Sequence, residues 1–551
     1  MVDGVSERYG NLLSGSYDCV DRVVLNAYYP LGHTPGGFRT WWRRWHDGSD
    51  DDLDNAHLMR MAGRFARRVR RWANANAVEV IDTTAGERKH RIAEEYLASH
   101  DVATGVFLIL VARAPATVWD VRRSKNGGHI GNLKKKKSYV NHYSFHIMDP
   151  DFGHVTIKMS GHPPFGAQVI LNGHEFVAAQ ATAARIGYTK EGNCFTATPD
   201  PAGLARIADT LSTTSITGRL GQVCDRWIYS ACLCFGFDLA DQDRSRFRYN
   251  YSIYHVEYSR NLIFASGAQL DRTFESIVDR TRSRLDVPKV RTMFGQKKRP
   301  HHKGGDLSSR QAAVIEKPRW DLTIFKVHFG LLTLKAYSKG EHVLRFEAVV
   351  HNTRQLGVGR VLERFPDIVS RLRGMVDRFL TMLDCVDVGF IADGILDDLP
   401  APGRLGATRL GGIDLNKPRA RAVLAAAAAL AVAPDGFTVA DFAAKINAMG
   451  ALAGTEYTVR QAAYDLRKLR AKALIVKPDH SRRYQVPPAA ARTMSALGVL
   501  RDQVIAPILA GVTSPRRGRR PATWTKIDQD YDTLRVNMRT LFDDLGLATA
   551  A

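Results

Sequence analysis

Cysteine is scarce in this sequence, with six residues in 551, and no two of them form a CxxC pair. A disulfide framework needs dense, paired cysteines and a zinc ribbon needs two closely spaced pairs, so the sequence excludes both classes. Cys232 and Cys234 lie in the apolar stretch IYSACLCFGF. We expect them to pack as small hydrophobic side chains.

Long apolar runs are also missing. The nearest to one, residues 420 to 433, is short, rich in alanine and interrupted by Arg421, so it predicts a buried helix rather than a membrane span. Residues 1 to 16 are polar and lack the apolar core of a secretory signal. We therefore expect a cytoplasmic protein with no membrane partner.

Acidic residues are too few to balance the basic ones. The chain has 56 Asp and Glu against 78 Lys and Arg, a formal net charge of +22. Such an excess favours polyanions, because each neutralised phosphate releases condensed counterions. Nucleic acid is the predicted partner, and a basic protein with no such partner is the alternative. The sequence leaves oligomerisation open.

A basic helix is predicted between residues 57 and 72. Leu58, Met61, Phe65, Val69 and Trp72 recur at three- and four-residue steps after the start signals Asp52 and Asp54. The other positions carry arginines without nearby acids, which favours phosphate contacts over a solvated face. The residues predicted to contact nucleic acid here are Arg60, Arg64, Arg67, Arg68 and Arg71.

A second basic element is the stretch VRRSKNGGHIGNLKKKKSY, residues 121 to 139. Its glycines predict a flexible loop, and Lys134, Lys135, Lys136 and Lys137 are predicted to contact phosphates. A solvated surface loop is the alternative. The stretch SPRRGRRPATW, residues 514 to 524, adds Arg516, Arg517 and Arg519, either as an extended element contacting the minor groove or phosphates, or as a linker.

The region from 419 to 487 has a helical pattern followed by a short β-like segment. Thr438 and Thr458 are predicted N-caps of two helices. The second of them, RQAAYDLRKLRAKALI, and the following VKPDHSRRYQVP resemble the recognition helix and wing of winged-helix proteins. In such a helix Ala463, Leu466, Leu469 and Leu474 would face inward. The resemblance implies nucleic-acid contacts by Arg460, Tyr464, Arg467, Lys468, Lys472, Arg482 and Arg483, or else a fold used for protein contacts.

Histidines and carboxylates are densest between 142 and 175, where we predict β-structure around a Pro-Asp-Phe-Gly turn. Such side chains are what a phosphodiesterase site with a divalent metal needs. Ordinary turn chemistry is the alternative, because no HExxH or His-hydrophobic-His motif occurs. The candidate catalytic residues are His142, His146, Asp149, Asp151, His154 and Glu175, with Asp149, Asp151 and His154 as metal ligands.

The segment LLTLKAYSKGEHVLRFE, residues 331 to 347, contains Tyr337, Lys339, Gly340, Leu344, Arg345 and Glu347. This pattern resembles a strand pair of replication initiators from rolling-circle plasmids and filamentous phages. The resemblance implies that Glu347 helps to bind a metal. It also implies that a tyrosine, with Tyr337 as one candidate, attacks the scissile phosphate to leave a 5′-phosphotyrosine. A β-hairpin with a charged tip is the alternative.

Together these patterns predict a multi-domain α+β or α/β protein, with mixed sheets before a C-terminal winged helix and a helical tail. The predicted segments are 1–120 (α/β, arginine-rich helix), 121–293 (β-rich, His/Asp cluster), 294–315 (basic linker), 316–412 (α+β), 413–490 (winged helix) and 491–551 (helical tail).

The functional expectation is DNA processing for a mobile or replicating element, by metal-dependent cleavage or strand transfer or by replication initiation. Mg²⁺ or Mn²⁺ would be the cofactor of a catalytic protein, and a non-catalytic one would need none. The alternatives are a DNA-binding replication or regulatory protein without catalysis, and an RNA-binding protein.

Overall fold

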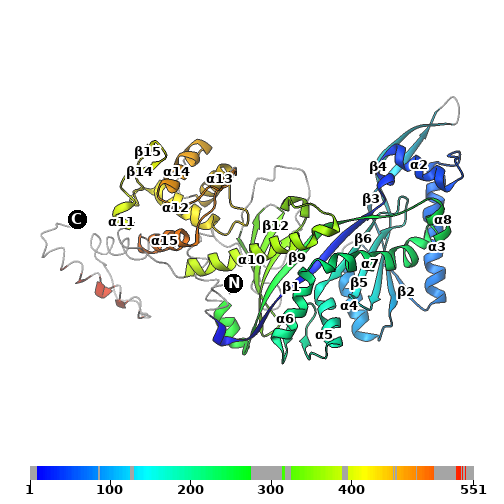
Figure 1. Cartoon of the computed structure of the whole chain (residues 1–551), viewed down its shortest axis with the longest axis horizontal. Helices are drawn as coiled ribbons and strands as arrows, with labels where there is room; N and C mark the ends of the chain where they lie inside the picture. The colour runs from blue at the N-terminus through cyan, green and yellow to red at the C-terminus, as the bar shows by residue number, and fades with distance from the viewer. Residues whose placement is uncertain are drawn as a thin grey trace. The chain divides into compact units, whose positions relative to one another are not determined.

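The computed structural model describes residues 9–84, 87–124, 129–274, 313–316, 324–329, 331–387, 395–450, 452, 456–479 and 481–501, with parts of 526–540 (Figure 1). The chain divides into two compact units. The first, called the sheet unit, comprises Leu12–Leu270 and Leu331–Val376. The second, called the helical unit, contains the residues from Asp377 onward together with Met1–Asn11 and Asp271–Gly330.

The sheet unit is built on a mixed sheet with the strand order β12-β13-β9-β1-β6-β5-β4-β3-β2. Strands β2 and β3 are parallel neighbours joined by helix α4, and the other neighbours are antiparallel. This mixture of sheet and helices confirms the predicted α+β class. The strands are β1 (Leu13–Tyr28), β2 (Glu79–Asp82), β3 (Gly105–Arg123), β4 (Ile130–Asp149), β5 (Gly153–Ser160), β6 (Ala167–Asn172), β9 (Asn250–Phe264), β12 (Leu332–Lys339) and β13 (Val343–Val350).

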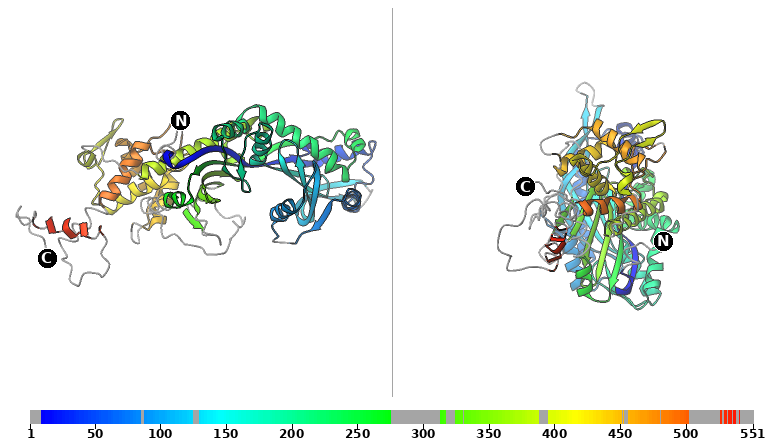
Figure 2. Two further views of the ribbon diagram at one scale, coloured as in Figure 1. Left: turned by 90° about the horizontal axis from the view of Figure 1, so that it is seen from below. Right: turned by 90° about the vertical axis from the view of Figure 1, so that its left-hand side faces the viewer.

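Strand β1 is the element that joins the two halves of this sheet, and it can be followed as one long blue strand in Figure 2. It pairs with β9 along its length and with β6 over Arg22 to Ala27. Between Val20 and Val23 its register with β9 shifts. Such a bulge re-aims the inserted side chains. Here it holds Asp21, whose carboxylate is buried.

Helices cover the sheet with apolar side chains. Trp41 and Trp42 of α2 are fully buried, and Leu58, Met61, Phe65 and Val69 of α3 face the core as their spacing predicts. Asp54 caps the start of α3. The helices are α2 (Pro35–Trp45), α3 (Asn55–Ala75), α4 (Lys89–Ser99), α5 (Gly173–Ala183), α6 (Pro201–Asp209), α7 (Ser215–Ala231), α8 (Leu239–Arg244) and α10 (Phe365–Asp387).

The basic stretch predicted as a loop is instead part of a long β-hairpin. β4 includes all of Lys134 to Lys137 and pairs with β3 out to Arg123. Its inner neighbour β5 pairs only as far as His142, and β2 pairs with β3 only as far as Val111. Beyond these points β3 and β4 pair with each other alone, as the two-stranded arm visible in Figure 1. Cross-strand pairing and the burial of Val118, Trp119 and Leu133 outweigh the loop preference of the flanking glycines.

The helical unit contains three consecutive helices, α12 (Pro418–Leu430), α13 (Val439–Met449) and α14 (Val459–Ala471), followed by α15 (Pro488–Val499). Isolated bridges link Phe437 to Tyr484 and Val476 to Gln485. Capping boxes at Thr438 and Thr458 confirm both predicted helix starts. Further strands of this unit are β10 (Ala313–Glu316), β11 (Ile324–Phe329), β14 (Gly403–Leu405) and β15 (Thr408–Leu410).

One predicted inward position in α14 is displaced by one residue. Leu466, Leu469 and Leu474 are buried as predicted, but Ala463 is only half-buried and Ala462 faces the core. Asp465, which the prediction did not place on the inward face, is also buried there, and its carboxylate accepts from Arg419 and Tyr457. Its burial accounts for the rotation of the inward face of α14 toward Ala462.

The predicted segment boundaries differ from the observed units. The boundary at 120/121 falls inside β3, and the segments on both sides of it belong to the sheet unit together with residues 331–376. The predicted linker lies outside the described residues up to 312, and its end enters β10. Among the helices of the described ranges, none has the length and apolar character needed to span a membrane.

Helix α5 packs closely on β1 at Gly173, its first residue, and a substitution there tests this packing. A Cβ atom at this position would lie 1.9 Å from the Val20 carbonyl oxygen, whereas one at Gly218 in α7 would meet nothing within 4 Å. We expect Gly173→Ala to cost about 1–3 kcal/mol and to lower the melting temperature. Gly218→Ala, the matched control, gains about 0.5–1 kcal/mol. Equal melting temperatures for both variants would contradict this packing.

Candidate functional site

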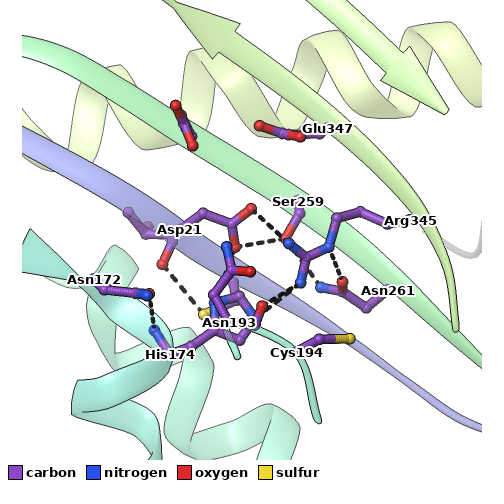
Figure 3. Close-up of polar contacts among 12 residues, drawn as sticks. Asp21, Asn172, His174, Asn193, Cys194, Ser259, Asn261, Arg345 and Glu347 are labelled. Carbon is purple, nitrogen blue, oxygen red and sulfur yellow. Dashed lines mark hydrogen bonds and ion pairs between the residues drawn. The ribbon is translucent and has the colours of Figure 1, made fainter. Parts of the chain in front are cut away.

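A buried polar network lies where β1, β9 and β13 meet the first turn of α5 (Figure 3). Arg345 of β13, fully buried, is its centre. Its Nε donates to Asn261 Oδ1 at 2.7 Å, and its Nη2 donates to the Asn193 carbonyl oxygen at 2.6 Å. Its Nη1 lies 3.4 Å from Asp21 Oδ2. The network therefore joins segments that are far apart in the sequence.

His174 connects α5 to this network. Its Nδ1 lies 3.0 Å from Asp21 Oδ1, while its Nε2 lies 3.4 Å from Arg345 Nη2 and 3.3 Å from the Tyr17 hydroxyl. A guanidinium can only donate, so Nε2 must accept and the ring proton sits on Nδ1. Burial lowers the pKa of His174 to about 4, which keeps the ring neutral at pH 7.

Asp21 is the negative partner of this network. Burial alone would raise its pKa, but the charge of Arg345, with His174 beside the carboxylate, outweighs burial and holds the pKa of Asp21 well below its usual range. The Ser259 hydroxyl also donates to Asp21 Oδ1, at 2.9 Å. The carboxylate is therefore ionised and held by partners from three other elements.

A second polar group, called the Glu347 group, lies on β12 and β13. The Tyr337 hydroxyl donates to Glu347 Oε2 at 2.8 Å, and Lys335 Nζ lies 3.1 and 3.2 Å from the two carboxylate oxygens. The register explains the contact, because Lys335 stands directly opposite Glu347 and Tyr337 opposite Arg345. The structure thus brings together the two residues that the initiator resemblance selected.

Glu257 and His255 of β9 complete the Glu347 group. His255 Nε2 lies 2.7 Å from Glu257 Oε1. Burial raises the pKa of Glu347, and the neighbouring charge of Glu257 raises it further, while Lys335 lowers it. Lys335 is the neighbouring cation of both carboxylates, Glu257 and Glu347.

The pKa of Tyr337 is raised well above its ordinary value, first by burial and then by the charge of Glu347. Lys339, two residues further along β12, has a pKa lowered to about 8, chiefly by burial and by the charge of Arg345. The tyrosine is therefore neutral near pH 7 and donates its proton to Glu347 in a hydrogen bond.

The predicted His/Asp cluster is split into separate contacts. His146 Nδ1 lies 2.9 Å from His154 Nε2, and burial lowers the pKa of His146 to about 3. Glu175, on α5, is ion-paired with Lys190 at 2.7 Å. Burial, with Lys158 and Lys89 nearby, lowers the pKa of His142 to about 4.

Asp149 and Asp151 belong to a structural turn. Asp149 Oδ1 accepts from the backbone N–H groups of Asp151 and Phe152, and its Oδ2 accepts from Arg226 at 2.6 Å and Trp227 at 2.7 Å. Asp151 also pairs with Arg226, at 3.0 Å. These partners use the lone pairs that a metal would require.

Two groups of the described residues place three ligand atoms within 4.8 Å of one another: Cys19, Asp21 and His174, and His46, Asp52 and His57. The predicted trio Asp149, Asp151 and His154 is not among them. In the first group Arg345 already provides the positive charge. The second group is partly exposed, with His57 Nδ1 3.3 Å from Asp52 Oδ2.

The predicted nucleic-acid contacts lie on several surfaces. On α3, Arg60, Arg64, Arg67 and Arg71 are exposed and Arg68 is half-buried. On α14, Arg460, Tyr464 and Arg467 are exposed, while Lys468 and Lys472 are half-buried. Lys134 to Lys137, Arg482 and Arg483 are exposed as well. Arg516, Arg517 and Arg519 lie outside the described residues.

No family model, curated protein or solved structure matches this chain.

Sequence reasoning missed Asp21, His255 and Glu257 as parts of polar groups, and it placed His174 only within the dense stretch from 142 to 175. In the extended geometry of β9, His255, Glu257, Ser259 and Asn261 are spaced two residues apart and so share one face of the strand. A row of polar side chains on one face of a strand that pairs with other strands on both edges was the signal that could have indicated a polar group. The sequence held no signal for the contacts of these residues with β1 and α5, because those elements are distant in the sequence.

The buried neutral His174 makes stability depend on pH. Its folded pKa of about 4 lies below the ordinary 6.5, so the unfolded chain takes up a proton first as pH falls. This contribution is complete above pH 6.5 and is lost as pH falls from 6.5 toward about 4. We expect the melting temperature to drop over this range, and to drop less in His174→Asn than in the exposed-site control His129→Gln. Identical pH profiles for the two variants would contradict the neutral ring.

Proposed function

We propose that this protein binds duplex DNA through α14 of the helical unit. The observation that carries the proposal is the exposed row Arg460, Tyr464 and Arg467 on a helix whose opposite face packs into the core. Arg460 and Arg467 have no acidic partner among the described residues. A basic helix face of this kind suits the major groove, where arginine reads base edges and contacts phosphates.

The elements around α14 support a winged-helix module. Three helices precede a chain segment that returns through Val476 and Tyr484, and the Phe437–Tyr484 bridge closes it against the start of α13. The tip between these bridges carries the exposed Arg482 and Arg483. In a winged helix such a tip contacts the phosphate backbone beside the recognition helix, which gives these arginines a positioning role.

Replacing Arg460 and Arg467 together by alanine tests duplex binding. Each base or phosphate contact is worth ~1–3 kcal/mol, so we expect the variant to bind a duplex at least about tenfold more weakly and with a shallower salt dependence. The measurement is fluorescence anisotropy of labelled duplexes over a salt series.

The control is Arg91→Ala/Arg244→Ala, which removes two exposed arginines paired with Glu95 and Asp241. Equal weakening in the control would show a mere net-charge effect. Unchanged affinity in the α14 variant would remove this helix from the interface, and tighter binding of RNA duplexes would favour the RNA-binding alternative.

A second candidate function is cleavage of one DNA strand at the Glu347 group. The direct Tyr337–Glu347 hydrogen bond is the observation that favours it. Glu347 would take the proton as the tyrosine oxygen attacks phosphorus, the P–O bond to the neighbouring sugar would break, and the leaving 3′-oxygen would take a proton from solvent. Lys335 and Lys339 would face the phosphate charge.

The donor types of the same group suit a divalent metal, but Glu257, Glu347 and His255 do not place their ligand atoms within 4.8 Å of one another in this structure. Glu257 and Glu347 offer carboxylate oxygens of the kind Mg²⁺ and Mn²⁺ prefer, with His255 beside them. Such an ion, when bound, would neutralise charge on the phosphate. Burial and the neighbouring charge of Glu257 both raise the pKa of Glu347, an effect that a bound cation would offset.

Cleavage is tested with single-stranded and duplex DNA, with and without Mg²⁺ or Mn²⁺. We expect Tyr337→Phe to abolish both cleavage and an SDS-stable protein–DNA adduct, and Glu347→Gln to slow cleavage about 10²–10⁴-fold. Tyr254→Phe, at an exposed tyrosine of β9, is the control. Adduct formation by Tyr337→Phe would exclude this tyrosine, and DNA binding by the wild type without cleavage would leave a non-catalytic DNA-binding protein.

A further inference from the structure

The arm formed by β3 and β4 presents one exposed face between the sheet and its distal end. Directly opposed residues of an antiparallel pair share a face. The register therefore places Arg113 with Asn141, Pro115 with Tyr139, and Thr117 with Lys137 on one side. All of these residues are exposed.

Tyr139 stands in the middle of this face with 66% of its surface exposed. Its backbone carbonyl oxygen accepts from Arg113 Nη2 at 3.4 Å, which brings the guanidinium across to the neighbouring strand. A large aromatic ring on paired strands is held rigidly by the backbone and still offers its face to solvent. Burial in this fold does not require a tyrosine here.

The charge around Tyr139 has a single sign. The face carries Arg113 and Lys137 beside the ring, followed by Lys135, whose Nζ lies 5.6 Å from the Trp119 ring centre. No acidic residue occurs at the positions of this face, from 113 to 119 on β3 and from 135 to 141 on β4. Lys134 and Lys136 add positive charge on the opposite face.

An exposed ring flanked by cations matches the chemistry of an unpaired nucleotide strand. The bases of a duplex are already stacked on both sides, whereas an unpaired base can stack on an aromatic side chain while its phosphates contact lysine or arginine. Charge complementarity gives the attraction, and the ring gives the preference for unpaired bases.

We propose that this face of the arm binds single-stranded nucleic acid, with a base stacked on Tyr139 and phosphates on Arg113 and Lys137. The inference rests on the proposed function only in assuming a nucleic-acid partner. It assigns the single strand to the arm and leaves the duplex to α14, so the two sites are separable by mutation.

The test measures the affinity of the full-length protein for labelled oligo-dT and oligo-U of ~15 nucleotides and for a duplex of the same length. We expect Tyr139→Ala to bind both single strands about tenfold more weakly or worse, and Tyr139→Trp to bind them as tightly as the wild type. Duplex affinity stays unchanged in both variants. Loss of Lys137 lowers the salt slope for single strands by about 0.7.

Tyr254→Ala, at an exposed tyrosine away from the arm, is the control and keeps wild-type affinity for all probes. Tighter binding of oligo-dT than of oligo-U identifies DNA as the source of the strand, and the reverse identifies RNA; both support the site. Wild-type affinity of Tyr139→Ala for single strands overturns the proposal, as does equal weakening for duplex and single strands.

The two proposals fail in different ways. Duplex binding that depends on Arg460 and Arg467, without any effect at Tyr139, overturns the arm site and keeps the proposed function. Absence of binding to every probe by the wild type overturns both. Because Tyr139 is exposed, unchanged melting temperatures are expected for its variants and confirm that they fold.

Discussion

The buried ion pair between Arg345 and Asp21 is the interaction on which the sheet unit depends. It links residues 324 positions apart and draws in Asn261, His174 and the Asn193 carbonyl oxygen. Two charges without access to water are tolerable only when each has several hydrogen-bonding partners. Removing one partner of such a pair typically costs about 3–5 kcal/mol, because the other charge is left buried and uncompensated. The network therefore specifies one arrangement of β1, β9, β13 and α5.

The Glu347 group is positioned by the same strand. Arg345 and Glu347 are two residues apart on β13, so both project from one face of the sheet. Fixing Arg345 against Asp21 also fixes Glu347 beside Tyr337, Lys335 and Glu257. The structural network pairs its two charges in full burial, whereas the Glu347 group holds neighbouring carboxylates and a tyrosine with partial exposure. That difference is why the proposed chemistry is placed at the second group and the structural role at the first.

The basic charge of the chain is divided among surfaces of different geometry. A helix face with Arg460, Tyr464 and Arg467 suits a duplex groove, and a flat strand pair with Tyr139 suits unpaired bases. A protein that opens or cuts DNA needs to hold both forms, since strand separation converts one into the other. The arginine face of α3 supplies a further positive surface on the sheet unit.

Local patterns in the sequence determined the helices and strands themselves. Apolar spacing predicted α3, and threonine caps predicted the starts of α13 and α14. The hairpin that brings Tyr337 to Glu347 could be predicted because its two strands are adjacent in the sequence. The tertiary structure decided everything that depends on distant segments. Lys134 to Lys137 lie in a strand because β3 pairs with them, and the Asp149 carboxylate accepts from Arg226 and Trp227 of α7. Asp21, His174 and Arg345 meet only in the folded sheet. Periodicity records which face of an element is buried, but it does not record which other element covers that face.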